Sequence, residues 1–211
     1  MNPVAVGLLE RDIYWVFHMT HVDNVIPILQ TGLLSRREIQ RRRVEYRDIS
    51  NQAVQRFRAD REIFGVTPLH EFIPFHFAWF TSMQRDVEKR GSSARDALVF
   101  LDVRVDKLAE LKKSICFTTD NAAKHRIEPS NDWTALDAIE WAMVKRIKTR
   151  ETPPKRALMR AAELLVSSPV PPECIGQVVC RSQLTRWRLD KSLRAAKLDV
   201  PVVVEARRFL S

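Results

Sequence analysis

Glycine is scarce in this chain, with five residues among 211. Proteins that cradle nucleotides in a glycine-rich loop carry a Gly-x-Gly-x-x-Gly or Walker pattern, and the sequence contains neither. We therefore expect any bound nucleotide to be held mainly by side chains.

Cysteine is also scarce, with Cys116, Cys174 and Cys180 as the three examples. Their odd number and the lack of a Cys-x-x-Cys spacing argue against a disulfide framework and against a zinc site. No neighbouring group is placed to lower a thiol pKa, so we expect buried, reduced thiols without a catalytic role.

Long apolar runs are missing as well. No run approaches the roughly 20 residues of a membrane span, and the N-terminus lacks the basic flank and apolar segment of a secretory signal. We expect a cytoplasmic protein with no membrane partner. A hydrophobic content of 45% in 211 residues predicts one domain, residues 1–211, with a substantial core.

Positive charge is abundant, with a formal net charge of +9. Clustered Lys and Arg favour a polyanionic partner, because they release counterions from phosphates. The most basic segment is 35–47, which contains Arg36, Arg41, Arg42, Arg43 and Arg47. Such a run is usually a solvated face, and here it is also a candidate for phosphate contact.

Patterns of β-branched, aromatic and helix-forming residues predict an α+β domain whose strands come from both ends of the sequence. We expect Pro74 to mark a sheet edge or a bulge, because proline cannot donate to a strand ladder. The predicted strands are 13–17, 72–80, 97–103, 114–118, 175–180 and 200–204. The predicted helices are 23–31, 51–61, 131–147 and 181–197, and segment 156–166 is ambiguous between helix and strand.

Two histidines and a threonine lie within four residues in segment 18–24, directly after the first predicted strand. No third metal ligand follows at a recognised spacing, so no metal site is predicted. A Ser-His-Asp triad is equally unsupported, because no Gly-x-Ser-x-Gly elbow is present. The residues alone favour a core or capping role for His18 and a helix-start role for His21.

Four stretches, in order, resemble the DarT-type DNA ADP-ribosyltransferases, bacterial toxins paired with a macrodomain antitoxin. They are Tyr14-x-x-x-His18-x-Thr20-His21-x-Asp23-Asn24 with Ile28-Leu29-x-x-Gly32-x-Leu34, the basic segment 49–58, the block 69–77, and 160–166 with Val170-Pro171 and Ile175. The resemblance spans nearly the whole chain. The sequence departs from it after Phe77, where Ala78-Trp79-Phe80-Thr81-Ser82-Met83 replaces the usual Pro-Arg-Ser-Pro-Met.

The resemblance implies an ADP-ribosyltransferase-like fold, with a central split, mixed or antiparallel sheet flanked by helices. It implies a mono-ADP-ribosyltransferase that uses NAD as co-substrate, needs no metal and modifies a base in single-stranded DNA. It also implies a macrodomain antitoxin as partner, and we expect a monomer. The resemblance implies that Glu163 and Arg58 are the catalytic residues, with Arg56 and Arg61 as alternatives to Arg58. The implied NAD-binding residues are His18, Thr20, Asn24, Gly32 and Leu33.

The implied DNA contacts remain open between two interpretations. Arg41, Arg42, Arg43 and Arg47 fall where the family places a loop over NAD and DNA. Trp79 and Phe80 are candidates for stacking on an unpaired base, although buried core is the commoner role of such aromatics. Without the resemblance, Glu163 reads as a solvent-facing glutamate on a helix, and Asn24 serves either to fix a loop or to touch the nucleotide.

Two other function classes stay in view. One is a basic nucleic-acid-binding module that has the fold without catalysis. The other is an NAD-dependent enzyme similar to RNA 2′-phosphotransferases, which require a 2′-phosphate on RNA. The sequence does not decide between thymine and guanine as the acceptor base.

Overall fold

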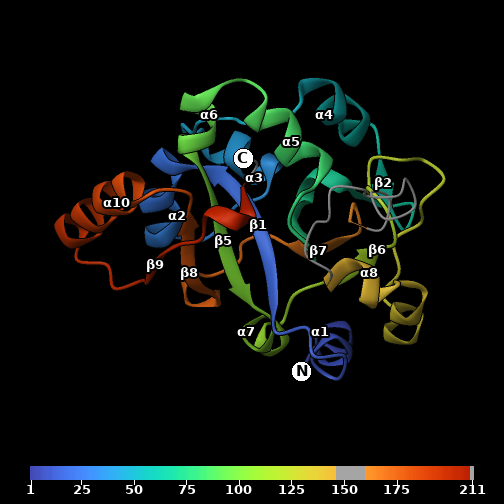
Figure 1. The fold of residues 1–211 in the computed structure, drawn as a ribbon. Coiled ribbons are helices and arrows are strands. Elements are labelled where there is room, and N and C mark those ends of the chain that lie inside the picture. The colour runs from blue at the N-terminus through green and yellow to red at the C-terminus, as the bar shows by residue number, and fades with distance from the viewer. Residues whose placement is uncertain (146–159, 210–211) are drawn as a thin grey trace.

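A seven-stranded sheet runs through the centre of the molecule (Figure 1), in a computed structural model that describes residues 1–145 and 160–209. The strand order is β6-β7-β4-β1-β5-β8-β9, and every neighbouring pair is antiparallel except β8 with β9. A mixed sheet built from both ends of the chain confirms the predicted α+β class. The sheet strands are β1 (Trp15–His21), β4 (Phe72–His76), β5 (Leu98–Arg104), β6 (Ile115–Thr118), β7 (Glu163–Ser167), β8 (Ile175–Cys180) and β9 (Val202–Val204).

The sheet is split between β1 and β4. These strands are paired at Phe17 and His76, whereas β1 and β5 are paired along their whole length. Pro74 lies in β4, an interior strand that shows no bulge in its register with β7. The predicted sheet edge is present only locally, because Pro74 lies beside the split, where β4 has no ladder with β1. The carbonyl of Pro74 accepts a hydrogen bond from the His18 side chain, and its missing N–H lies on the same side of the strand as this carbonyl. Proline is tolerated in the sheet interior because no backbone ladder is needed there.

Strand β1 extends further than the sequence predicted. The expected range of 13–17 placed His18 and Thr20 after the strand, but β1 continues to His21. A short 3-10 helix, η1 (Val22–Asn24), then leads into α2 (Val25–Thr31), with the His21 side chain accepting from the backbone N–H of Asp23. The predicted helix-start role of His21 is thereby confirmed.

Helices cover the two faces of the sheet. Four of them, α1, α2, α7 and α10, bury apolar side chains against one face and form the main core with it. The α-helices are α1 (Pro3–Leu9), α2, α3 (Arg36–Arg42), α4 (Gln52–Ala59), α5 (Ser82–Glu88), α6 (Ser92–Ala97), α7 (Val105–Glu110), α8 (Trp141–Lys145) and α10 (Gln183–Ala196). The remaining elements are the hairpin β2 (Glu62–Ile63) with β3 (Thr67–Pro68), and the 3-10 helices η2 (Leu69–Glu71), η3 (Trp133–Ala138), η4 (Pro172–Cys174) and η5 (Ala206–Arg208).

The single helix predicted for 131–147 is wrong within the described residues. Asp132 caps a 3-10 helix, η3, and α8 begins separately at Trp141, whose indole N–H donates to the carbonyl of Leu136. Residues 146–159 lie outside the described part of the chain. The ambiguous segment 156–166 is resolved where it is described, because Glu163 opens strand β7.

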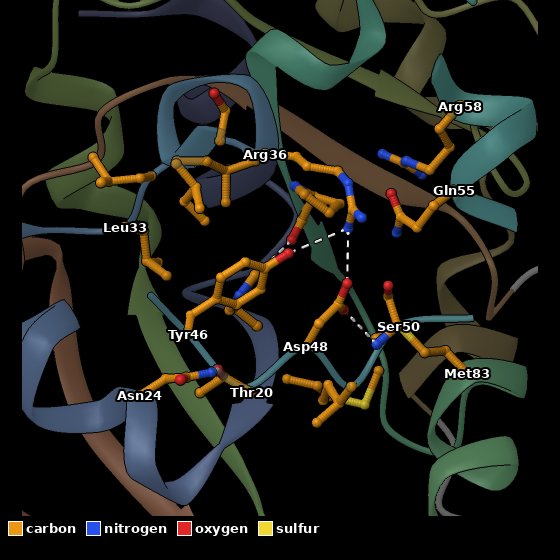
Figure 2. A pocket seen from close by; sticks show the side chains of 18 of the residues that line it. Thr20, Asn24, Leu33, Arg36, Tyr46, Asp48, Ser50, Gln55, Arg58 and Met83 are labelled. Atoms are coloured by element: carbon orange, nitrogen blue, oxygen red, sulfur yellow. Dashed lines mark hydrogen bonds and ion pairs between the residues drawn. The ribbon is translucent and has the colours of Figure 1, made fainter. Parts of the chain in front are cut away.

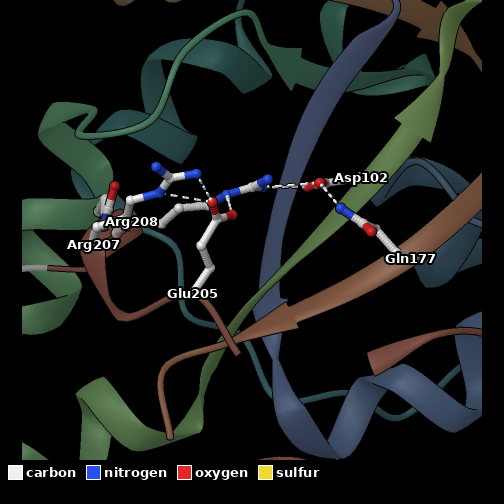
Figure 3. Close-up of polar contacts among 6 residues, drawn as sticks. Asp102, Gln177, Glu205, Arg207 and Arg208 are labelled. Atoms are coloured by element: carbon white, nitrogen blue, oxygen red, sulfur yellow. Dashed lines mark hydrogen bonds and ion pairs between the residues drawn. The ribbon is translucent and has the colours of Figure 1, made fainter. Parts of the chain in front are cut away.

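The second face of the sheet carries two smaller cores, one against β1, β5 and β8 and one against β4, β6 and β7. Strand register places Glu163, His76, Phe17 and Asp102 in one row across this face, since antiparallel partners project to the same side. At one end of the row, the buried carboxylate of Asp102 accepts from Arg208 at 2.7 and 2.9 Å (Figure 3). This pair fastens the C-terminal η5 to the sheet.

None of the described helices is long and apolar enough to span a bilayer. The three cysteines are free and buried, as predicted from their spacing. Burial raises the pKa of the Cys116 thiol to about 12 and those of Cys174 and Cys180 to about 11.

Candidate active site

A cavity of about 240 Å³ opens at the split between β1 and β4. Its walls come from β1, α2, α3, α4, β4, the start of α5, the end of β7 nearest Glu163, and the α3–α4 loop, which we define as residues 43–51. Figure 2 shows side chains from these elements converging on one space. Segments that are far apart in the sequence therefore meet at one site.

Glu163 and Arg58 form a buried ion pair in this cavity. Arg58 Nη1 lies 2.9 Å from Glu163 Oε2 and 3.3 Å from Oε1, and the two residues are 2% and 6% exposed. Glu163 sits on strand β7, which contradicts the interpretation of a solvent-facing glutamate on a helix. A carboxylate at this depth is retained only with a partner, and Arg58 supplies one. The two predicted catalytic residues are thus brought together.

The geometry also distinguishes Arg58 from its neighbours. Arg56 is exposed on α4. Arg61 is buried, but its guanidinium donates to the carbonyls of Lys124 and Ile127 and therefore supports a loop. Of the three arginines left open by the sequence, Arg58 is the one at the carboxylate.

His18 lies inside β1, and its Nδ1 is 3.0 Å from the carbonyl oxygen of Pro74. A carbonyl only accepts hydrogen bonds, so Nδ1 carries the proton and Nε2 is left as an acceptor. Burial lowers the pKa of His18 to about 4, so the imidazole is neutral at pH 7. The residue offers the cavity a fixed acceptor.

Asn24 is fully engaged in fixing the α3–α4 loop. Its side-chain amide donates to Thr20 Oγ1 and to the carbonyl of Arg47, both at 3.0 Å, and its carbonyl accepts from the Arg47 backbone at 2.8 Å. Of the two roles left open for Asn24, these bonds favour loop fixation over contact with a nucleotide. Thr20 accepts from Asn24 and keeps its own hydroxyl hydrogen to donate.

Gly32 and Leu33 line the cavity, but their backbones serve the scaffold. Gly32 ends α2 with φ +89°, and a Cβ there would meet the carbonyl oxygen of Val170 at 2.5 Å. Leu33 exchanges two backbone hydrogen bonds with Val170, at 2.8 and 2.9 Å. The Leu33 backbone is therefore not available to a ligand, which limits its predicted NAD contact to the side chain.

The four arginines predicted to contact DNA fall into different environments. Arg41 and Arg42 both pair with the buried Glu38, so one of their two positive charges is compensated. Arg43 is exposed in the left-handed conformation that ends α3. Arg47 lines the cavity with an exposed side chain whose Nε lies 3.5 Å from Asp23 Oδ2. Arg47 thus has the geometry most suited to phosphate contact.

Trp79 and Phe80, the candidates for stacking on a base, have different surroundings. Trp79 packs against Phe17, with ring centroids 5.7 Å apart, and the Arg208 guanidinium lies 4.3 Å from its ring centroid. Phe80 lies under the Arg160 guanidinium at 5.7 Å. Trp79 is a partly buried member of the second-face core, which was the alternative given for the aromatics. Phe80 is also partly buried but packs in none of the described cores, so its stacking on a base stays a prediction.

The family model described as "ssDNA thymidine ADP-ribosyltransferase, DarT" matches residues 17–210. The chain belongs to the DarT family. Membership confirms the resemblance drawn from the four sequence stretches, and the matched range contains both Arg58 and Glu163.

Sequence relatives and solved structures are consistent with this family membership. A "DNA ADP-ribosyl transferase" of Escherichia coli O127:H6 is 24% identical over 204 residues, 93% of each chain. A fusion of such a transferase with a DNA ADP-ribosyl glycohydrolase, from Thermosipho africanus, is 24% identical over 94% of this chain and 49% of its own length. The structure of Thermus sp. 2.9 DarT with ADP-ribosylated ssDNA has a TM-score of 0.82 at 18% identity, covering 94% of this chain and 97% of that one. The same Thermus protein with NAD+ gives a TM-score of 0.78 over 94% and 98%. These structures confirm the predicted fold.

Several residues at this DarT-family cavity were missed by sequence reasoning. His76 is the register partner of Glu163 across β4 and β7, and its pKa is lowered mainly by burial, with the Glu163 carboxylate opposing the shift. Tyr46 and Asp48, which the sequence did not single out either, line the cavity together with Arg36. The motif offered a signal for His76, since it lies in the matched block 69–77. Arg36 belongs to the basic segment 35–47, which the sequence analysis named as a candidate for phosphate contact without distinguishing this arginine from its neighbours. Among the described residues, no cluster of His, Cys, Asp or Glu has a metal-binding arrangement.

Proposed function

We propose that this chain transfers the ADP-ribose of NAD to a thymine base in single-stranded DNA. The observation that carries the proposal is the buried Glu163–Arg58 pair at the cavity of a DarT-family chain. Support comes from the family description, from curated relatives named for the same activity, and from a related structure in complex with NAD+. We also infer that the protein acts in the cytoplasm.

The reaction breaks the bond between ribose C1′ and the nicotinamide nitrogen, whose electron pair leaves with nicotinamide. Positive charge develops on the ribose, and the buried Glu163 carboxylate stabilises it. Arg58 holds this carboxylate in one orientation. Charge developing next to a fixed carboxylate is the main contribution that we assign to the protein.

The acceptor atom follows from the chemistry of thymine. Its N1 is bonded to deoxyribose, so N3 is the ring nitrogen that can form a new bond to C1′. The N3 proton must leave as that bond forms, and we assign its transfer to Glu163, which becomes neutral. Nicotinamide, the modified base and one proton account for all the atoms exchanged.

The neutral His18 supports the binding of NAD. Its acceptor Nε2 suits the nicotinamide amide N–H or a ribose hydroxyl, and the Thr20 hydroxyl can donate beside it. Side chains therefore replace the glycine-rich loop that the sequence lacks.

Single-stranded DNA suits this chemistry, because N3 of thymine is engaged in base pairing in a duplex and cannot attack C1′ until the base is unpaired. The Thermus structure with ADP-ribosylated ssDNA supports the same substrate class. The formal charge of +9 favours association with its phosphates.

We further propose that this protein is a monomer and that it is the toxin of a toxin–antitoxin pair. The Thermosipho fusion, which joins a transferase to a DNA ADP-ribosyl glycohydrolase, supports a partner that removes the modification. A macrodomain antitoxin with glycohydrolase activity fits this role.

The test is mass spectrometry of defined oligonucleotides after incubation with NAD. Oligonucleotides with thymine as the sole acceptor in a cytosine background should gain one ADP-ribose, and matched guanine-containing ones should not. Modification at guanine would overturn the acceptor assignment. Nicotinamide release without any DNA product, or transfer of a 2′-phosphate from RNA, would overturn the function, and complete inactivity would favour a binding module.

A further inference from the structure

Arg36 presents a guanidinium group to the cavity from the first turn of α3. Its Nη1 lies 3.0 Å from Asp48 Oδ2 and 3.3 Å from the hydroxyl of Tyr46 (Figure 2). Both partners belong to the α3–α4 loop, and both line the cavity. The side chain of Arg36 is 24% exposed, so it is partly desolvated but still accessible. Charge-assisted bonds at such a position are stronger than at an open surface.

The other cations of the cavity wall are less suited to an anion inside it. In the described part of the chain, the lysine and arginine side chains that line the cavity are Arg36, Arg47 and Arg58. Arg58 is committed to Glu163. The side chain of Arg47 is 73% exposed and lies beside Asp23, so it faces mainly solvent. Arg36 is thus the accessible, partly buried cation that is not held by the proposed catalytic carboxylate.

We propose that Arg36 binds the pyrophosphate of the dinucleotide, and that the Asp48 carboxylate holds the same guanidinium until the dinucleotide displaces it. This assignment rests on the proposed NAD-dependent transfer. It identifies the residue that binds the pyrophosphate, which takes no part in the bond changes of the reaction. A guanidinium has five donors in a planar fork that matches phosphate oxygens. Both contacts that Arg36 makes with the loop use Nη1 alone.

The hydrogen bonds of Asp48 keep its carboxylate charged and in place to compete with the pyrophosphate for Arg36. Its carboxylate also accepts from the backbone of Ser50 at 2.8 Å and from the side chain of Gln52 at 3.0 Å. Despite its burial, these bonds and Arg36 lower the pKa of Asp48 to about 2, so the group carries its full negative charge at pH 7. The carboxylate and an incoming phosphate therefore compete for one cation, and ligand binding is coupled to the α3–α4 loop.

Isothermal titration with ADP-ribose and, separately, with nicotinamide tests this exchange. ADP-ribose carries the pyrophosphate but has no nicotinamide to lose, so binding is measured without turnover. Arg36→Gln should weaken ADP-ribose binding about 10- to 100-fold, the usual value of a charge-assisted contact. Asp48→Asn removes the competing charge, keeps an acceptor for Ser50, and should tighten ADP-ribose binding about 3- to 10-fold. Nicotinamide binding should change in neither variant.

Matched controls separate the site from general charge effects. Arg37→Gln removes the same charge from the next residue, whose Nε pairs with Glu71 at 3.2 Å. Asp137→Asn removes a carboxylate from another arginine pair, with Arg11 at 2.6 Å. Both should bind ADP-ribose within about twofold of wild type, as expected of ion pairs on the surface. In turnover, Arg36→Gln should raise the KM for NAD and leave kcat at saturating NAD nearly unchanged.

The outcomes separate the inference from the function on which it rests. Wild-type protein that binds neither NAD nor ADP-ribose would overturn both. Wild-type binding that Arg36→Gln leaves intact, with an unchanged melting temperature, would overturn the Arg36 assignment alone. Weaker binding by Asp48→Asn would overturn the competition, because it would show that the carboxylate assists the ligand.

Discussion

Burial strengthens the electrostatic attraction between Glu163 and Arg58. At a surface, the attraction between two such groups is weak, but at 2.9 Å and with little exposure it fixes the carboxylate strongly. The protein thereby holds a negative charge in place before any positive charge develops on the ribose. Preorganisation of this kind costs nothing further at the moment of reaction.

Replacement of Arg58 by glutamine should lower kcat about 100-fold or more, because Glu163 loses the partner that orients it. The exposed Arg56 is the matched control, since it lies on the same helix, and Arg56→Gln should stay within about twofold of wild type. Nicotinamide release at saturating NAD and DNA gives the rates, and circular dichroism checks folding. Equal rates for the two variants would reduce Arg58 to a structural cation.

His18 should make the free energy of unfolding depend on pH. Its pKa falls from 6.5 to about 4 on folding, so the unfolded chain binds the proton more readily. Above pH 6.5 the imidazole is neutral in both states and contributes no difference. Between pH 6.5 and 4 the unfolded state is favoured, by about 3 kcal/mol at pH 4.

Urea unfolding of wild type and His18→Asn at pH 7 and pH 4.5 measures this effect. Asparagine keeps a donor for the Pro74 carbonyl but does not titrate, so the variant should lose less stability on acidification. A loss identical to that of wild type would assign the pH dependence to other groups.

At the scale of elements, the Asp102–Arg208 pair joins the C-terminal η5 to the sheet. Gln177 donates to the same carboxylate at 2.7 Å, and Glu205 pairs with the guanidinium (Figure 3). The backbone carbonyl of Arg208 also accepts from Gln84 at 2.6 Å, which ties η5 to α5. One residue therefore connects two elements, and α5 in turn forms part of the cavity wall.

Arg208→Met should lower the free energy of unfolding by about 3 to 5 kcal/mol, since it leaves the Asp102 carboxylate buried without its cation. Arg207, exposed and paired with Glu205, is the matched control, and Arg207→Met should cost less than about 1 kcal/mol. The double variant Asp102→Leu with Arg208→Met should recover part of the loss. Equal midpoints in guanidinium for wild type and Arg208→Met would refute the fastening role.

Element type was predictable where local pattern dominates. Strand-forming runs indicated β5 and β8, and a basic segment indicated α10, whose Ser182 cap was not predicted. The position of Pro74 was not predictable, because it depends on a split in the sheet that pairs a side chain, His18, with a backbone carbonyl. A contact of this kind produces no periodic pattern of apolar residues from which it could be predicted.

At the scale of the molecule, the site was predictable only in part. Glu163 and Arg58 are 105 positions apart, and the family resemblance, not spacing, suggested both. The resemblance could not show that Asn24 fixes a loop or that Trp79 is covered by Arg208. These roles arise from contacts between segments that are distant in the chain. Such contacts cannot be recognised from a single sequence.

The overall positive charge should make DNA binding depend strongly on salt. Each phosphate neutralised on a single strand contributes a slope of about −0.7 in a plot of log K against log salt concentration. Arg47→Gln should reduce the magnitude of that slope by about 0.7, because this arginine lies at the mouth of the cavity. Arg194→Gln, on the exposed side of α10, is the control and should leave it unchanged. Fluorescence anisotropy of a labelled oligonucleotide provides the measurement, and an equal effect of both variants would mean that only net charge matters.

The most direct single measurement is the mass of a thymine-containing oligonucleotide after incubation with NAD and either wild-type protein or Glu163→Gln. Glutamine keeps the size of the side chain and removes the charge that stabilises the ribose. We expect wild type to add one ADP-ribose and Glu163→Gln to do so about 1,000-fold more slowly, with ADP-ribose binding retained. Transfer by Glu163→Gln within about tenfold of the wild-type rate would contradict the assignment of the reaction to the Glu163–Arg58 pair.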